Sequence, residues 1–69
     1  PPKVEPIVRG IIESFRNGER DNVAVWLEKV GRPFYVNYMA VRDQNNNYLG
    51  TLELVQDMQF AKEHFASVK

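Results

Sequence analysis

The stretch RDQNNNYLGTLELVQD, residues 42–57, holds three consecutive asparagines between two segments rich in apolar and β-branched residues. It could be a linker, a carboxamide-rich site or the turn of a hairpin. Asparagine tolerates positive φ better than any residue except glycine, so an asparagine run between apolar segments is typical of a tight turn. We therefore expect an antiparallel hairpin with strands at about 34–42 and 48–56.

A third strand is expected before this hairpin. The segment at about 23–30 is rich in β-branched and aromatic residues, and Gly31-Arg32-Pro33 separates it from the next strand. That break is short enough for the two strands to pair antiparallel.

Helices are expected on both sides of the strands. Apolar residues recur at spacings of three and four over about 4–17, which indicates an amphipathic helix that Asn17-Gly18 ends. Asp57 stands at an N-cap position before a second helix at about 58–67. Residues 1–69 are thus predicted to form one α+β domain: a three-stranded antiparallel meander, an amphipathic helix packed on one face, and a short C-terminal helix.

Size and charge limit the possible functions. A chain of 69 residues without cysteine buries only about 60% of its unfolded surface, so we expect it to gain stability from a partner, most simply a second copy in a homodimer. Nine basic residues balance nine acidic ones, which argues against nucleic acid or an anionic membrane surface as a partner. The short apolar runs and the absence of cysteine fit a cytoplasmic protein without a membrane span.

Residues for catalysis or metal binding do not form a recognisable set. His64 is the only histidine, and without a second histidine or a cysteine there is no metal-ligand pattern. The serines, the threonine and His64 show no spacing that suggests a nucleophile with its base. The chain is therefore not expected to be an enzyme. The aromatic residues resemble a base-stacking surface, but the neutral charge favours ordinary sheet packing.

The segments VNYMAVRDQNNNYLGTLELVQDM (36–58) and PKVEPIVRGIIESFRNGERDNVAVW (2–26) together resemble the PAS superfamily of sensory domains. The similar branch is the PAS-like domains that accompany hemerythrin-type helical domains in bacterial and archaeal proteins. Two departures stand out: Asn46-Asn47 replaces the glycine usual in the turn, and Met58-Gln59 replaces Ile-Thr after the aspartate.

The resemblance covers only part of a PAS domain. Such domains have about a hundred residues, and this chain resembles the C-terminal half. In a complete PAS fold an N-terminal strand would pair with the outer side of strand 48–56. We therefore expect this strand to have an unpaired edge that invites another chain.

The two faces of the expected sheet give conflicting indications. Hydrophobicity alone would turn Leu52 and Leu54 inward and leave Glu53 in water. The resemblance implies the opposite orientation, with Glu53 and its same-face neighbours toward a helix-covered pocket. On this basis the candidate pocket residues are Phe15, Trp26, Phe34, Val36, Tyr38, Glu53 and Val55. The candidate dimer or docking surface is Met39, Leu52 and Leu54.

Two functions remain open at this point. The resemblance implies a non-catalytic module that binds an unidentified small molecule and relays a signal, with Glu53 either contacting the ligand or bonded to a neighbour such as Tyr38. The alternative is a structural module that forms a homodimer or docks a neighbouring domain without a ligand. An enclosed cavity lined by Phe15, Phe34 and Tyr38 would favour sensing, and collapsed side chains would favour assembly.

Overall fold

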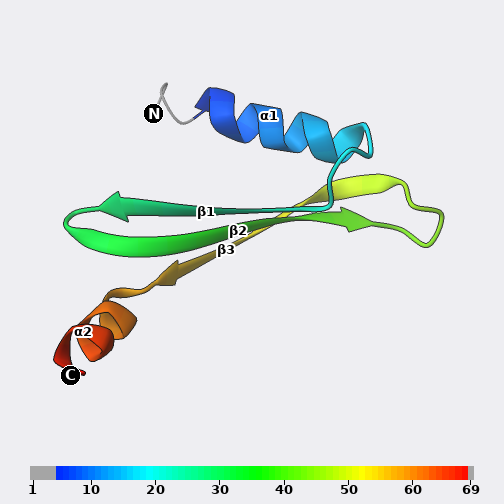
Figure 1. Cartoon of the computed structure of the whole chain (residues 1–69). Coiled ribbons are helices and arrows are strands. Elements are labelled where there is room, and N and C mark those ends of the chain that lie inside the picture. Colours follow the sequence, from blue (N-terminus) through cyan, green and yellow to red (C-terminus); the bar gives the residue numbers. More distant parts are fainter. Residues whose placement is uncertain (1–4, 69) are drawn as a thin grey trace.

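The computed structural model describes residues 5–68. Helix α1 (Glu5–Arg16) is followed by strands β1 (Asn22–Lys29), β2 (Arg32–Arg42) and β3 (Tyr48–Asp57) and by helix α2 (Gln59–Ser67) (Figure 1). The α+β fold class predicted from the sequence is confirmed. Residue 4, where the first helix was expected to begin, lies outside the described residues.

The three strands form one antiparallel sheet in the order β1-β2-β3. Helix α1 lies along one face of this sheet, and α2 lies beyond the end of β3 (Figure 1). Within residues 5–68, β1 and β3 each have one side without a strand partner. Such unpaired edges leave backbone N–H and C=O groups available to another chain.

The core lies between α1 and the centre of the sheet. Phe15 is 0% exposed, and Ile11 and Val36 are also buried. Ile11 and Phe15 lie four residues apart, one above the other on the same face of α1, and this face meets β2. The core is small, and many large apolar side chains elsewhere remain exposed.

Arg42, at the end of β2, ties the C-terminal end of α1 to the sheet. Its Nη2 atom donates a hydrogen bond of 2.7 Å to the Phe15 carbonyl and one of 3.3 Å to the Arg20 carbonyl. Its Nε atom donates to Asp21 Oδ1 at 3.0 Å. The last carbonyls of a helix have no partner within the helix, so Arg42 satisfies one of them and holds the following loop as well.

The turn between β1 and β2 is at Val30-Gly31, one residue earlier than the expected Gly31-Arg32-Pro33 break. Lys29 pairs directly with Arg32, and φ is +54° at Val30 and +73° at Gly31. Two central residues with positive φ define the short hairpin turn whose twist matches that of the strands. Valine is poorly suited to this conformation because its branched Cβ crowds the backbone.

We expect Val30→Asn to stabilise the protein by about 1 kcal/mol, because asparagine adopts positive φ at a lower cost. Val30 is 88% exposed, so the substitution loses little burial. For a chain of this size the melting temperature, followed by circular dichroism, should rise by about 5 °C. As a control, Gly31→Ala should lower it, since no atom crowds that position and only backbone strain changes. A decrease with Val30→Asn would show that the valine side chain makes a stabilising contact.

The turn between β2 and β3 is organised by Asp43. Its Oδ1 atom accepts hydrogen bonds of 2.9 Å from the backbone N–H groups of Asn45 and Asn47, and its Oδ2 atom accepts one of 3.1 Å from Asn47 Nδ2. Asn46 has a φ of +66°, the conformation for which asparagine substitutes well for glycine. The asparagine run is therefore a hairpin turn.

These hydrogen bonds make the turn sensitive to acid. The hydrogen bonds from Asn47 and Asn45 lower the pKa of Asp43 below its usual 3.8. A lowered pKa in the folded state contributes stability that is present above the unfolded value and lost as the pH falls through the folded value. As the pH is lowered below about 4, we expect the melting temperature of the Asp43→Asn variant to decrease less steeply with pH than that of the original chain. Glu19→Gln, which removes a carboxylate from the loop after α1, is the matched control, and equal slopes for all three proteins would contradict this role.

Asp57 lies one position before the N-cap of α2. The N-cap residue is Met58, whose side chain makes no capping bond, and Asp57 Oδ1 accepts instead from the Gln59 N–H at 2.9 Å. Asp57 Oδ2 also accepts from Arg32 Nε at 2.8 Å. The hydrogen bonds from Gln59 and Arg32 lower the pKa of Asp57. This residue therefore joins the start of β2, the end of β3 and the start of α2.

Candidate functional site

The strand register assigns each side chain to one of two faces. Val36 on β2 pairs with Val25 on β1 and with Val55 on β3. Because side chains alternate along each strand, this row defines one face, which we call the helix face because α1 covers part of it. The helix face includes Val23, Val25, Leu27, Lys29, Phe34, Val36, Tyr38, Ala40, Thr51, Glu53 and Val55.

A concave groove lies on the helix face beside the β1–β2 turn. It has a volume of about 670 Å³ and is lined by Leu27, Glu28, Lys29, Val30, Phe34, Val36, Tyr38, Glu53 and Val55. None of these residues belongs to the described part of α1, so the groove occupies the part of the helix face that α1 leaves uncovered. Figure 1 shows the β1–β2 hairpin extending past the N-terminal end of that helix.

One polar pair lies on the otherwise apolar floor of the groove. Tyr38 and Glu53 are directly opposite each other on β2 and β3. Burial raises the pKa of the Tyr38 phenol, and the hydrogen bond and negative charge of Glu53 raise it further. At neutral pH the phenol therefore stays protonated and faces the Glu53 side chain across the two strands. Tyr38 is the neighbour that the sequence analysis named for Glu53, and the strand register places the two side by side.

Two of the candidate pocket residues lie elsewhere. Phe15 is fully buried between α1 and the sheet, and it fills the core instead of lining the groove. Trp26 pairs with Tyr35, so strand alternation places it on the opposite face from Val36. Its assignment to the pocket is wrong. The sequence held a signal for this, because Trp26 has the opposite parity from Val23, Val25 and Leu27.

The opposite face of the sheet carries an exposed apolar surface, which we call the outer patch. It consists of Trp26, Tyr35, Met39, Leu52 and Leu54, which share one face by the strand register. The Trp26 and Tyr35 rings pack with centroids 4.7 Å apart and planes inclined at 52°. Trp26 is 64% exposed and Leu52 is 55% exposed. Asn37, opposite Leu54, shares this face with them. Exposed apolar side chains gathered on one face are typical of sites that bind another protein.

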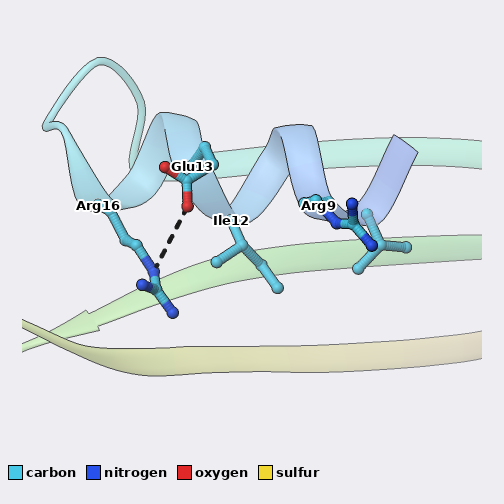
Figure 2. A pocket seen from close by; sticks show the side chains of 5 residues that line it. Arg9, Ile12, Glu13 and Arg16 are labelled. Carbon is cyan, nitrogen blue, oxygen red and sulfur yellow. Dashed lines mark ion pairs between the residues drawn. The ribbon is translucent and has the colours of Figure 1, made fainter. Parts of the chain in front are cut away.

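A smaller hollow lies along α1 and was not anticipated from the sequence. Figure 2 shows Arg9, Ile12, Glu13 and Arg16 around it, and with Val8 they line a volume of about 290 Å³. Arg16 Nε lies 3.9 Å from Glu13 Oε1, and the Arg16 guanidinium carbon lies 5.8 Å from the centre of the Tyr48 ring. Both partners of the ion pair are well exposed, so the pair contributes little to stability.

Residues 5–68 hold no group of three or more His, Cys, Asp or Glu side chains placed to bind a metal ion. Neither α1 nor α2, as described, is long and apolar enough to cross a membrane.

The chain has one helix on an antiparallel meander, with a groove beside the helix. This layered α+β arrangement belongs to the same structural class as the PAS fold. A family model described as a PAS domain matches residues 1–59, and the chain belongs to this family. PAS domains act as sensory or interaction modules and are generally non-catalytic, and they commonly mediate protein interactions.

A solved structure is similar to this chain in both sequence and fold. The crystal structure of a C-terminal domain from Streptococcus mutans has 44% sequence identity to this chain and a TM-score of 0.76. The match covers 93% of this chain and 49% of the other, so this chain spans about half the length of that neighbour. No curated protein matches the chain. The resemblance inferred from the sequence is thus confirmed for the PAS family.

Proposed function

We propose that the chain is the ligand-binding and relay part of a PAS sensory domain, of the branch that accompanies hemerythrin-type domains, and that a small molecule occupies the groove on the helix face. The observation that carries this proposal is the groove itself. Its volume of about 670 Å³ lies within the range of roughly 300–1,000 Å³ typical of small-molecule sites. Such sites combine mainly apolar walls with a few polar groups, as the valines, Phe34 and the Tyr38–Glu53 pair do here.

The relay would run along β3 to α2. Glu53 and Val55 contribute to the groove, and the same strand ends at Asp57, which hydrogen-bonds the first residue of α2 and Arg32. A ligand that changes the position of β3 would therefore change how α2 is held. Such a ligand can shift this equilibrium only by its difference in affinity for the two arrangements.

A second candidate function is assembly through the outer patch. Leu52 and Leu54 remain about half exposed, together with Trp26. A homodimer or a neighbouring domain that covered this patch would bury apolar surface that the chain alone leaves in water. The unpaired side of β3 could add backbone hydrogen bonds to the same contact.

A neutral probe and two variants separate the two functions. The probe 4-phenylbutanol should bind the original chain with a dissociation constant on the order of 1 mM, measured by shifts of backbone amide NMR signals. Val55→Trp, which fills the groove, should weaken this binding at least tenfold. Leu54→Ser, on the outer patch, should leave it unchanged and should lower the dimer fraction measured by light scattering. Shifts confined to residues outside the groove would contradict the ligand site, and a monomer at high concentration would contradict assembly.

A further inference from the structure

The charges around the groove restrict the chemistry of its occupant. The lining contains two carboxylates, Glu28 and Glu53, and one ammonium group, Lys29. Lys29 lies on the helix face beside the turn, whereas Glu28 has the opposite parity on β1. The Lys29–Arg32 row is six residues of extended strand, about 20 Å, from the Tyr38–Glu53 row. Glu53 is separate from them, on β3, and within residues 5–68 no cation pairs with it. The groove therefore carries an uncompensated negative charge at Glu53.

Glu53 also has unused hydrogen-bonding capacity. A carboxylate has about four lone-pair sites and accepts hydrogen bonds only. The Tyr38 hydroxyl, on the residue directly opposite Glu53, is one neighbouring donor, and the other lone-pair sites face the groove. The Tyr38 ring and the Phe34 ring border the same groove. An aromatic face attracts cations, and a carboxylate beside aromatic rings is a combination suited to an ammonium group.

The polar and apolar parts of the groove are separated along β2. Tyr38 and Glu53 form one row, Val36 and Val55 the next, and Leu27 and Phe34 the row beside the turn. Four residues of extended strand span about 13 Å, the distance from the first row to the third. A molecule with a polar end at Glu53 therefore has an apolar surface of about this length to cover on the way to Phe34.

We propose that the groove selects organic amines, with the protonated nitrogen at Glu53 and an apolar body lying over Val36, Val55 and Phe34. This inference rests on the proposed small-molecule function of the groove and specifies its ligand class. The protonated amine would donate hydrogen bonds to the carboxylate, and its positive charge would offset the negative charge of Glu53. An acid of the same shape would place two like charges together in a partly apolar site.

Three probes of matched shape test the proposal: 4-phenylbutylamine, 4-phenylbutanol and 4-phenylbutyrate, titrated at pH 7 into the 69-residue chain and followed by amide NMR shifts. We expect the amine to bind at least tenfold more tightly than the alcohol, and the carboxylate to bind most weakly. In Glu53→Gln the amine should lose about tenfold in affinity and become equal to the alcohol, whose own affinity should not change. Glu19→Gln removes a carboxylate from the loop after α1 and should leave all three affinities unchanged.

The outcomes distinguish the failure of this inference from the failure of the proposed function. If the alcohol binds in the groove but the amine binds no better, or if Glu53→Gln leaves the amine affinity intact, the amine preference is wrong and the small-molecule site stands. If none of the three probes binds at millimolar concentration, both are wrong. Unchanged melting curves for Glu53→Gln establish that its effect on binding does not arise from unfolding.

Discussion

Replacing Phe15 with alanine should unfold a large fraction of the chain at 25 °C. Phe15 is fully buried and is the largest side chain in a core that also contains Ile11 and Val36. Truncation of a buried phenylalanine to alanine costs about 3–5 kcal/mol, because burial is lost and a cavity remains. The total stability of a 69-residue chain is roughly 3–10 kcal/mol, so this one substitution removes much of it.

Urea denaturation followed by far-ultraviolet circular dichroism measures this effect directly. Phe60→Ala is the matched control, because Phe60 lies on α2 and is 72% exposed. It should change the unfolding free energy by less than about 0.5 kcal/mol. Equal losses for the two variants would show that the sheet does not depend on its contact with α1.

The second large effect is expected for Arg42→Ala, at about 2–4 kcal/mol. Arg42 is only 13% exposed, whereas its acidic partner Asp21 is 81% exposed. The ion pair with Asp21 therefore contributes little. Most of the loss comes from the carbonyls of Phe15 and Arg20, which would lose a charged donor, one of them at the end of α1. Hydrogen bonds to charged groups contribute more than neutral ones. Without Arg42, the Phe15 carbonyl would keep only the longer bond of 3.2 Å from the Gly18 N–H.

Two variants isolate the role of the guanidinium group. Arg42→Lys keeps the charge but lacks the planar fork that reaches the carbonyls and Asp21 together, so it should recover less than half of the loss. Arg32→Ala removes an arginine from a half-exposed pair with Asp57 and should cost less than about 1 kcal/mol. Full recovery by lysine would mean that charge alone, and not hydrogen-bond geometry, holds the helix end.

The elements set by local chemistry were predictable from the sequence. The asparagine turn follows from the backbone preference of asparagine, and Asn46 indeed has a positive φ. The amphipathic spacing of α1 and the alternation in the strands are likewise local patterns. The PAS resemblance added what hydrophobicity could not, because Leu52 and Leu54 are more apolar than Glu53 and yet lie on the outer patch, opposite the groove.

The features that depend on long-range geometry were not predictable. Arg42 contacts a carbonyl 27 positions away in the sequence, and no local pattern marks this contact. The position of the first turn was missed because valine is a poor residue for positive φ. The Val30-Gly31 turn therefore introduces local backbone strain at Val30. An enclosed cavity that included Phe15 was named as the outcome that would favour sensing. The structure instead has a groove beside α1 that Phe15 does not line, because Phe15 is buried in the core under this helix.

Strand β2 belongs to two surfaces at once. Tyr38 faces the groove and Met39, the next residue, faces the outer patch, because successive side chains point to opposite sides. A molecule bound at Tyr38 and a protein bound at Met39 would thus contact adjacent residues of β2 from opposite faces of the sheet. If occupancy of one surface displaces this strand, the affinity of the other must change, and linkage requires the same factor in both directions. A signal could in this way cross the thickness of a single sheet without a hinge.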